Sequence, residues 1–262
     1  MTPALLRARL QAALGDRFPA ALSPAARPAP ELVSTGVAAV DALAGGLPRG
    51  ALTEICGPAS SGRTTLLLAA LAEATRRQEA CALVDAGDAF DPCSAAAAGV
   101  ELARLLWVRC GDVSRFPTQP ETRTVKRETF FLEQALRAAD LLLQAGGFGV
   151  MALDLGDVPP ALACRVPLTS WFRFRRAVER TPTVLLLLEQ EPCARTCASL
   201  VLQLQNKQSA FSSQHSANPS LDPTHARLLR GLRLQVEVVH SRLRKLPRAA
   251  GIEFESCAAW AG

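Results

Sequence analysis

A glycine-rich segment joins a short apolar run to a helical pattern, and it limits the chain to a few folds. Residues 51–56 have the composition of a buried strand, residues 63–77 have helical apolar spacing, and GPASSGRTT (57–65) lies between them. The segment matches G-x-x-x-x-G-K-[ST] except that Arg63 replaces lysine. Glycines let backbone N–H groups converge on phosphate oxygens, and the helix start adds its positive dipole end. A phosphate-binding strand–loop–helix unit is therefore predicted.

The nucleotide-binding prediction covers the whole loop, with Thr64 as a ligand of Mg²⁺. Arg63 keeps the positive charge of lysine but has a wide planar fork, so it either clamps phosphates or fills their pocket itself. The residues predicted to bind nucleotide are Gly57, Pro58, Ala59, Ser60, Ser61, Gly62, Arg63, Thr64 and Thr65.

A second candidate is Asp154, which ends the apolar run Val-Met-Ala-Leu (150–153). A carboxylate after a buried strand is the Walker B arrangement, in which it helps to hold Mg²⁺. The order of the two motifs along the chain strengthens the assignment. Asp157, three residues later, is interpreted as a loop or cap residue.

Strand and helix patterns alternate along the chain. Strands are expected at 51–56, 81–85, 105–109, 150–155 and 183–188, and helices at 63–77, 126–144 and 168–180. This alternation predicts an α/β fold with a mainly parallel twisted sheet flanked by helices. In the 126–144 helix the expected core residues are Phe130, Phe131, Leu132, Leu136, Leu141 and Leu142.

The C-terminal third changes to a period of two. Residues 200–205 and 232–240 alternate apolar and polar side chains, and 252–255 has the composition of a last strand. This pattern favours antiparallel strands with one wet face, which extend the sheet. The Ser-, Asn- and Pro-rich residues 206–224 are expected to form a mobile loop.

Composition excludes several classes of protein. The chain is 49% hydrophobic and 20% charged, which is enough to bury a core. No apolar run is long enough to cross a membrane, and no secretory signal is recognised at the N-terminus, so a cytoplasmic location is expected. The eight cysteines form no C-x-x-C pair, and the Cys193–Cys197 spacing has no second pair, so reduced structural thiols are expected.

Domain organisation and charge point to a partner near the C-terminus. Residues 1–30 are predicted to be an N-terminal arm with a Pro-rich linker, and residues 31–262 one core domain. Residues 31–101 hold nine acidic and four basic residues, a net charge of −5, whereas 224–250 hold seven basic and one acidic residue, a net charge of +6. A basic end favours a polyanionic partner.

Basic residues near that end and on one predicted helix are candidates for DNA or partner contacts: Arg173, Arg176, Arg242, Arg244 and Lys245. Aromatic residues interleave with the helical arginines, as they do in proteins that bind single strands. The i, i+3, i+7 spacing of Trp171, Phe174 and Val178 instead favours a core stripe. Weak, salt-sensitive binding of single-stranded DNA without base readout is therefore expected.

Several segments together resemble the RecA recombinase family. They are Ser34-Thr35-Gly36, Gly45-Gly46-Leu47-Pro48-Arg49-Gly50, Glu54-Ile55-Cys56-Gly57-Pro58, Asp85-Ala86, Asp91-Pro92, Glu189-Gln190 and Val238-Val239-His240-Ser241-Arg242. The resemblance covers about residues 32–256 and implies a RecA-like P-loop core that binds ATP and Mg²⁺. It also implies that Gln190 corresponds to the γ-phosphate sensor.

The chain departs from that family at the catalytic positions. Gly87 stands where the family has its catalytic glutamate, and Asp88, the next residue, is a weak substitute for it. Arg63 replaces the P-loop lysine, His240 replaces the first of two late lysines, and the segment after Gln190 is too short for the family's DNA-binding loop. Without a base to activate water, hydrolysis should fall by roughly 10²–10⁴.

With these departures, the chain resembles the ImuA-type accessory proteins of mutagenic DNA repair. That resemblance implies an ImuB-type polymerase-like partner, RecA itself, or both, together with weak or absent hydrolysis. An active single-stranded-DNA-dependent ATPase of the RecA family and another RecA-fold P-loop regulator remain alternatives. The arm at 1–30 either mediates self-association or binds a different partner.

Overall fold

The computed structural model describes Leu5, Leu6, Arg9 and residues 29–110, 124–206, 231–243 and 251–257. None of the helices in these ranges combines the length and the hydropathy needed to cross a lipid bilayer. The 206–224 loop predicted above lies outside the described residues from 207 onward. Nearly all of the predicted 1–30 arm, Arg244 and Lys245 also lie outside them.

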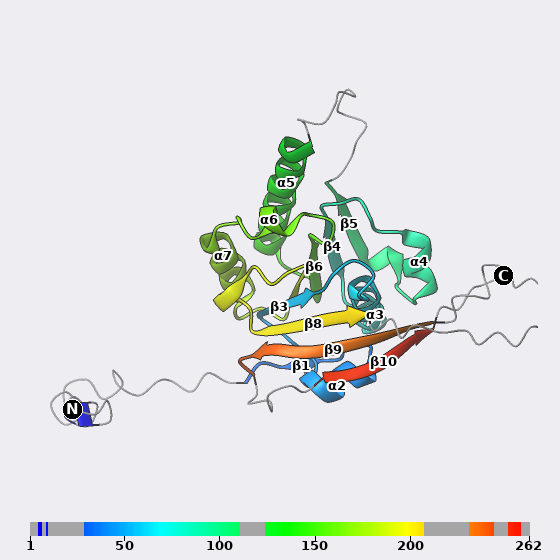
Figure 1. Ribbon diagram of the computed structural model, residues 1–262, viewed down its shortest axis with the longest axis horizontal. Coiled ribbons are helices and arrows are strands. Elements are labelled where there is room, and N and C mark those ends of the chain that lie inside the picture. Colours follow the sequence, from blue (N-terminus) through cyan, green and yellow to red (C-terminus); the bar gives the residue numbers. More distant parts are fainter. Residues whose placement is uncertain are drawn as a thin grey trace, which may run out of the picture.

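An eight-stranded sheet forms the centre of the fold (Figure 1). Its order is β10-β9-β8-β3-β7-β6-β4-β5; the six strands from β8 to β5 are parallel, and β9 and β10 are antiparallel. The strands are β3 (Ala51–Cys56), β4 (Cys81–Asp85), β5 (Leu105–Arg109), β6 (Val150–Asp154), β7 (Val184–Glu189), β8 (Leu200–Asn206), β9 (Gly231–Ser241) and β10 (Gly251–Cys257). The predicted α/β sheet with an antiparallel extension is confirmed.

Helices cover both faces of this sheet. In Figure 1, α5, α6 and α7 lie on one side, and α3 and α4 on the other. The helices are α2 (Ala38–Ala44), α3 (Arg63–Arg76), α4 (Pro92–Ala97), α5 (Thr124–Ala145), α6 (Pro160–Ala163) and α7 (Leu168–Val178), with 3₁₀ turns η1 (Leu102–Arg104) and η4 (Arg195–Cys197). A small antiparallel pair, β1 (Leu32–Val33) and β2 (Leu47–Pro48), precedes β3.

The core consists of two apolar layers, one under each set of helices. Trp171 and Phe174 are buried under α7, which confirms the predicted core stripe. The prediction for α5 was wrong at Phe130 and Leu141, which are 42% and 68% exposed. At 100° per residue both lie on the side opposite the buried stripe, which is made of Leu132, Ala135, Ala139 and Leu143.

One helix boundary and one strand pairing also differ from the sequence prediction. The basic helix ends at Val178 and not at Arg180, because Glu179 is extended and Arg180 has a positive φ of 73°. The strand expected at 200–205 is antiparallel to β9 on one side only; on the other it pairs in parallel with β3. Its first residues are therefore buried, and only its end has a wet face.

Candidate nucleotide site

Three predicted site segments meet at one edge of the sheet. β3, β7 and β6 are adjacent and parallel, so their carboxyl ends lie together. Gly57 follows β3, Gln190 follows β7, and Asp154 is the last residue of β6. Ligands of open α/β sheets bind at this edge.

The loop after β3 is shaped for close approach of its backbone. A Cβ at Gly57 would lie 2.4 Å from the carbonyl oxygen of Leu204, so only glycine fits there. Gly62 has φ 92° and is the N-cap residue of α3, and within the described part of the chain no side-chain hydrogen bond caps this helix start. The first N–H groups of α3 are thus available to an anionic ligand. Pro58, Ala59 and Ser60 form the exposed part of the loop, and Thr64 and Thr65 lie in the first turn of α3.

Two polar atoms of the loop are buried without a hydrogen-bond partner among the residues that the structure describes. They are the hydroxyl oxygen of Ser61 and the Nη1 of Arg63. A buried donor that stays unpaired costs about 1–3 kcal/mol, so such atoms are usually satisfied by a ligand or water. Together with the uncapped start of α3, they fit a phosphate-bearing ligand.

Arg63 and Gln190 meet at one carbonyl group. The Nη2 of Arg63 donates to the oxygen of Gly156 at 3.3 Å, and the Nε2 of Gln190 donates to the same oxygen at 3.1 Å. Gln190 also reaches the oxygen of Val158 at 3.5 Å. Arg63 of the P-loop and Gln190, the predicted γ-phosphate sensor, are therefore both hydrogen-bonded to the turn that follows Asp154.

Asp154 is largely buried beside this turn. Its Oδ1 accepts the backbone N–H of Gly156 at 2.8 Å. Burial raises the pKa of Asp154 to about 6, and the nearby Asp85 adds to this, while the Gly156 N–H and the charge of Arg63 oppose it. A cation beside such a carboxylate restores its charged form. The Asp154 carboxylate therefore suits the Mg²⁺ of a bound nucleotide, and Thr64, its predicted partner in this role, lies in the first turn of α3.

Asp88, the weak catalytic candidate, is engaged elsewhere. Its carboxylate forms a two-pronged ion pair with Arg109 of β5, at 2.6 and 2.7 Å. The Arg109 guanidinium also lies 4.9 Å from the centre of the Trp107 ring. Asp88 itself has a positive φ of 57°, so an unusual backbone conformation in the turn after β4 sets the direction of its side chain.

A different carboxylate lies against Gly87. A Cβ built on Gly87 would lie 2.8 Å from Oδ2 of Asp157, and its three nearest heavy atoms all belong to Asp157. Asp157 is exposed, and its charge acts on Asp154. Sequence reasoning treated Asp157 as a loop or cap residue, because its nearness to residue 87 depends on how β6 pairs with β4.

Asp85 has a structural role. It is buried and accepts the backbone N–H groups of Ala89 and Phe90 at 3.2 and 2.9 Å, and the Nε1–H of Trp107 at 3.3 Å. A carboxylate with this many donors fixes the turn that contains Gly87 and Asp88.

The predicted DNA or partner contacts are only partly placed. Arg173 and Arg176 are both exposed on α7, and Arg173 pairs with Asp140 of α5 at 2.8 Å. Arg242 is exposed after β9 and its guanidinium donates to the carbonyl of Thr196 in η4. Arg244 and Lys245 lie outside the described residues.

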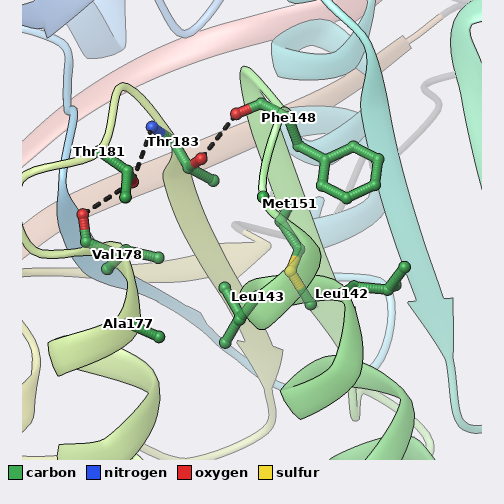
Figure 2. A pocket seen from close by; sticks show the side chains of 9 residues that line it. Leu142, Leu143, Phe148, Met151, Ala177, Val178, Thr181 and Thr183 are labelled. Carbon is green, nitrogen blue, oxygen red and sulfur yellow. Dashed lines mark hydrogen bonds between the residues drawn. The ribbon is translucent and has the colours of Figure 1, made fainter.

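A small cavity lies at the opposite edge of the sheet. It is lined by residues of α5, α7 and the starts of β6 and β7, including Leu143, Met151, Val178 and Thr183 (Figure 2). Its volume of about 10 Å³ is near the lower limit for one water molecule. This cavity is therefore separate from the nucleotide site.

The parallel sheet, the loop after β3 and the carboxylate ending β6 define a P-loop protein of the α/β class. A family model described as the RecA N-terminal domain matches residues 20–159. This chain therefore belongs to the RecA N-terminal domain family.

Relatives agree with this assignment, and a solved structure shares the fold. The chain is 33% identical over 176 residues to Protein RecA of Rhizobium leguminosarum bv. viciae, covering 61% of this chain and 45% of that protein. It is 35% identical over 176 residues to Protein RecA of Rhodospirillum rubrum, covering 61% and 43%. The chain thus matches less than half the length of these relatives. A KaiC-like protein from Pyrococcus horikoshii has the same fold, with a TM-score of 0.54 and 14% identity, covering 86% of this chain and 94% of that one.

Proposed function

We propose that this chain is a RecA-like accessory protein of DNA repair. In this proposal it binds ATP and Mg²⁺ at a modified P-loop, hydrolyses ATP weakly or not at all, and acts mainly through protein contacts in SOS mutagenesis and translesion synthesis, as ImuA-type proteins do. The observation that carries the proposal is the shared acceptor at Gly156. Arg63 and Gln190, the two groups expected to act on the terminal phosphates, are held there by the protein itself.

The binding part of the proposal rests on the loop. The N–H groups at the start of α3, the Ser61 hydroxyl and the Nη1 of Arg63 would hold the phosphates, and Thr64 with Asp154 would hold Mg²⁺. Bound Mg²⁺ neutralises phosphate charge. Gln190 would sense whether a γ-phosphate is present, because its side-chain amide must leave Gly156 to contact it, whereas Arg63 has a second nitrogen, Nη1, for the phosphates.

The weak-hydrolysis part rests on Gly87 and Asp88. Residue 87 has no side chain to orient water, and the carboxylate of Asp88 is paired with Arg109 at 2.6 Å. A base that is held by a strong ion pair is a poor proton acceptor.

A second candidate function is an active ATPase that depends on single-stranded DNA. Asp157 favours it, because this carboxylate lies against the position where the family has glutamate. DNA-stimulated hydrolysis that is lost in Asp157→Asn but kept in Asp88→Asn would support this function over the accessory one.

The accessory function is tested by complex formation between purified proteins. We expect the chain to co-sediment with an ImuB-type polymerase-like protein, with RecA, or with both, and ATP with Mg²⁺ to change the affinity. Thr64→Ala should remove the ATP effect and leave nucleotide-free binding intact. Failure to bind either partner in any nucleotide state would contradict an accessory role.

A further inference from the structure

A second group of buried polar side chains lies beside the nucleotide site. Glu54 is in β3, Glu189 ends β7, and Cys193 follows in the turn toward η4. Glu54 and Glu189 are fully buried and Cys193 is 4% exposed. One ligand atom from each residue lies within 4.8 Å of the other two.

Backbone N–H groups fix the orientation of Glu54. Its Oε1 accepts the N–H of Cys193 at 2.9 Å and that of Ala194 at 2.6 Å. Its other oxygen, Oε2, is buried without a hydrogen-bond partner. One oxygen is therefore anchored by two backbone N–H groups, and the other has no N–H donor among the described residues.

Both carboxylate oxygens of Glu189 contact Cys193. Its Oε1 accepts the N–H of Cys193 at 3.1 Å, and its Oε2 contacts the Sγ of Cys193. Anchoring of this kind is how proteins orient the residues that ligate a metal. One oxygen of each glutamate and the thiol of Cys193 then form a three-atom donor set.

The charge of this cluster also requires a partner. None of the ion pairs within the described residues includes Glu54 or Glu189. Burial raises the pKa of Glu189 to about 10, and a hydrogen bond with the Glu54 carboxyl group and the charge of that group both contribute. Two buried carboxylates this close must share either a proton or a cation.

We propose that Glu54, Glu189 and Cys193 bind a Zn²⁺ ion, with water as the fourth ligand. Zinc accepts thiolate and carboxylate together in tetrahedral sites, whereas Mg²⁺ requires an octahedral set of oxygens. When the metal binds, protons leave Cys193 and the carboxyl groups, and no redox step is involved. The ion would join β3, directly before the P-loop, to the turn directly after Gln190.

The test measures zinc and then cobalt in the full chain purified without chelator. We expect about one equivalent of zinc by mass spectrometry. After chelation, Co²⁺ in excess Mg²⁺ should give a sulfur-to-cobalt charge-transfer band. Cys193→Ser should lose the band, and Cys197→Ser, which removes a buried thiol of the adjacent η4 turn, should keep it.

Glu54→Gln is a second test in case Cys193→Ser does not fold. The amide oxygen that it introduces can still accept the N–H groups of Cys193 and Ala194, so we expect this variant to fold. We expect it to weaken Co²⁺ binding by more than the roughly 10- to 100-fold caused by losing a residue that only orients a ligand. A wild-type chain with neither zinc nor a cobalt band would overturn the proposal and leave a proton-sharing cluster. A band retained in Cys193→Ser would also overturn it. Neither readout uses nucleotide, so both are independent of the proposed ATP binding.

Discussion

The Nη2 of Arg63 donates a hydrogen bond to the carbonyl oxygen of Gly156, 3.3 Å away. This contact joins the start of α3 to the turn after β6, and Gln190 shares the same acceptor. The planar guanidinium spans this gap with one nitrogen while its Nη1 stays without a partner. The arginine therefore both braces the site and keeps a donor for phosphate.

Arg63→Ala should weaken ATP binding. A hydrogen bond to a charged group contributes about 1.5–3 kcal/mol, so we expect roughly a 10- to 150-fold loss of affinity. Titration calorimetry with ATP and Mg²⁺ measures it. Arg104→Ala is the control, since Arg104 pairs with Glu101 far along the chain from the loop. Equal affinity in Arg63→Ala and wild type would mean that Arg63 does not contact the nucleotide.

Gly87→Ala should destabilise the fold through Asp157. The new Cβ would meet Oδ2 of Asp157 at 2.8 Å, and crowding of this kind costs about 1–3 kcal/mol. Gly87→Ala should lower the free energy of unfolding by less in an Asp157→Gly background than in the wild-type chain, because Asp157→Gly makes room for the methyl group. Urea unfolding of the single and double variants forms a double-mutant cycle. Additive losses would show that the two positions do not touch.

Most of the fold follows from local sequence, and the exceptions have local causes. The runs that became β3, β4, β6 and β7 are mostly apolar, as strands covered on both faces should be, whereas β5 at the edge of the sheet is only partly buried. α4 was missed although Asp91 caps it by accepting the N–H groups of Cys93 and Ser94, because its apolar side chains are nearly all alanine. Phe130 and Leu141 were placed in the core by hydrophobicity alone, without the 100° test of helix phase.

The site was less predictable because it depends on contacts between distant residues. The loop, Asp154 and Gln190 are recognisable as motifs. The Asp157–Gly87 contact and the Glu54–Glu189 pair are not, since the first joins the turns after β6 and β4 and the second joins β3 to β7. Only strand order and register bring them together.

Acid should weaken the fold partly through Glu79. Burial raises the pKa of Glu79, but hydrogen bonds and charges from Arg77 and Arg49 outweigh burial and hold it below 4.5. The folded state thus binds this proton less readily, so the stabilisation is present above pH 4.5 and is lost as pH falls through the lower folded pKa. We expect Glu79→Gln to cost about 1 kcal/mol at neutral pH and little in acid, by urea unfolding. An equal cost at both pH values would contradict this.

Single-stranded DNA binding, if it involves α7, should depend more on Arg176 than on Arg173. Both side chains are exposed, but Arg173 is paired with Asp140 at 2.8 Å. Each lost phosphate contact should reduce the salt slope of log K by about 0.7. Fluorescence anisotropy at several salt concentrations compares Arg176→Ala with Arg173→Ala. An unchanged slope in Arg176→Ala would remove α7 from the DNA interface.

One experiment decides between an accessory protein and an active ATPase. It measures Mg²⁺-dependent ATP binding and single-turnover ATP hydrolysis, each with and without single-stranded DNA. Wild type should bind ATP, Thr64→Ala and Asp154→Ala should not, and DNA should not accelerate hydrolysis in any of them. Hydrolysis that DNA stimulates in wild type and that both variants lose would contradict an accessory role and establish an active ATPase.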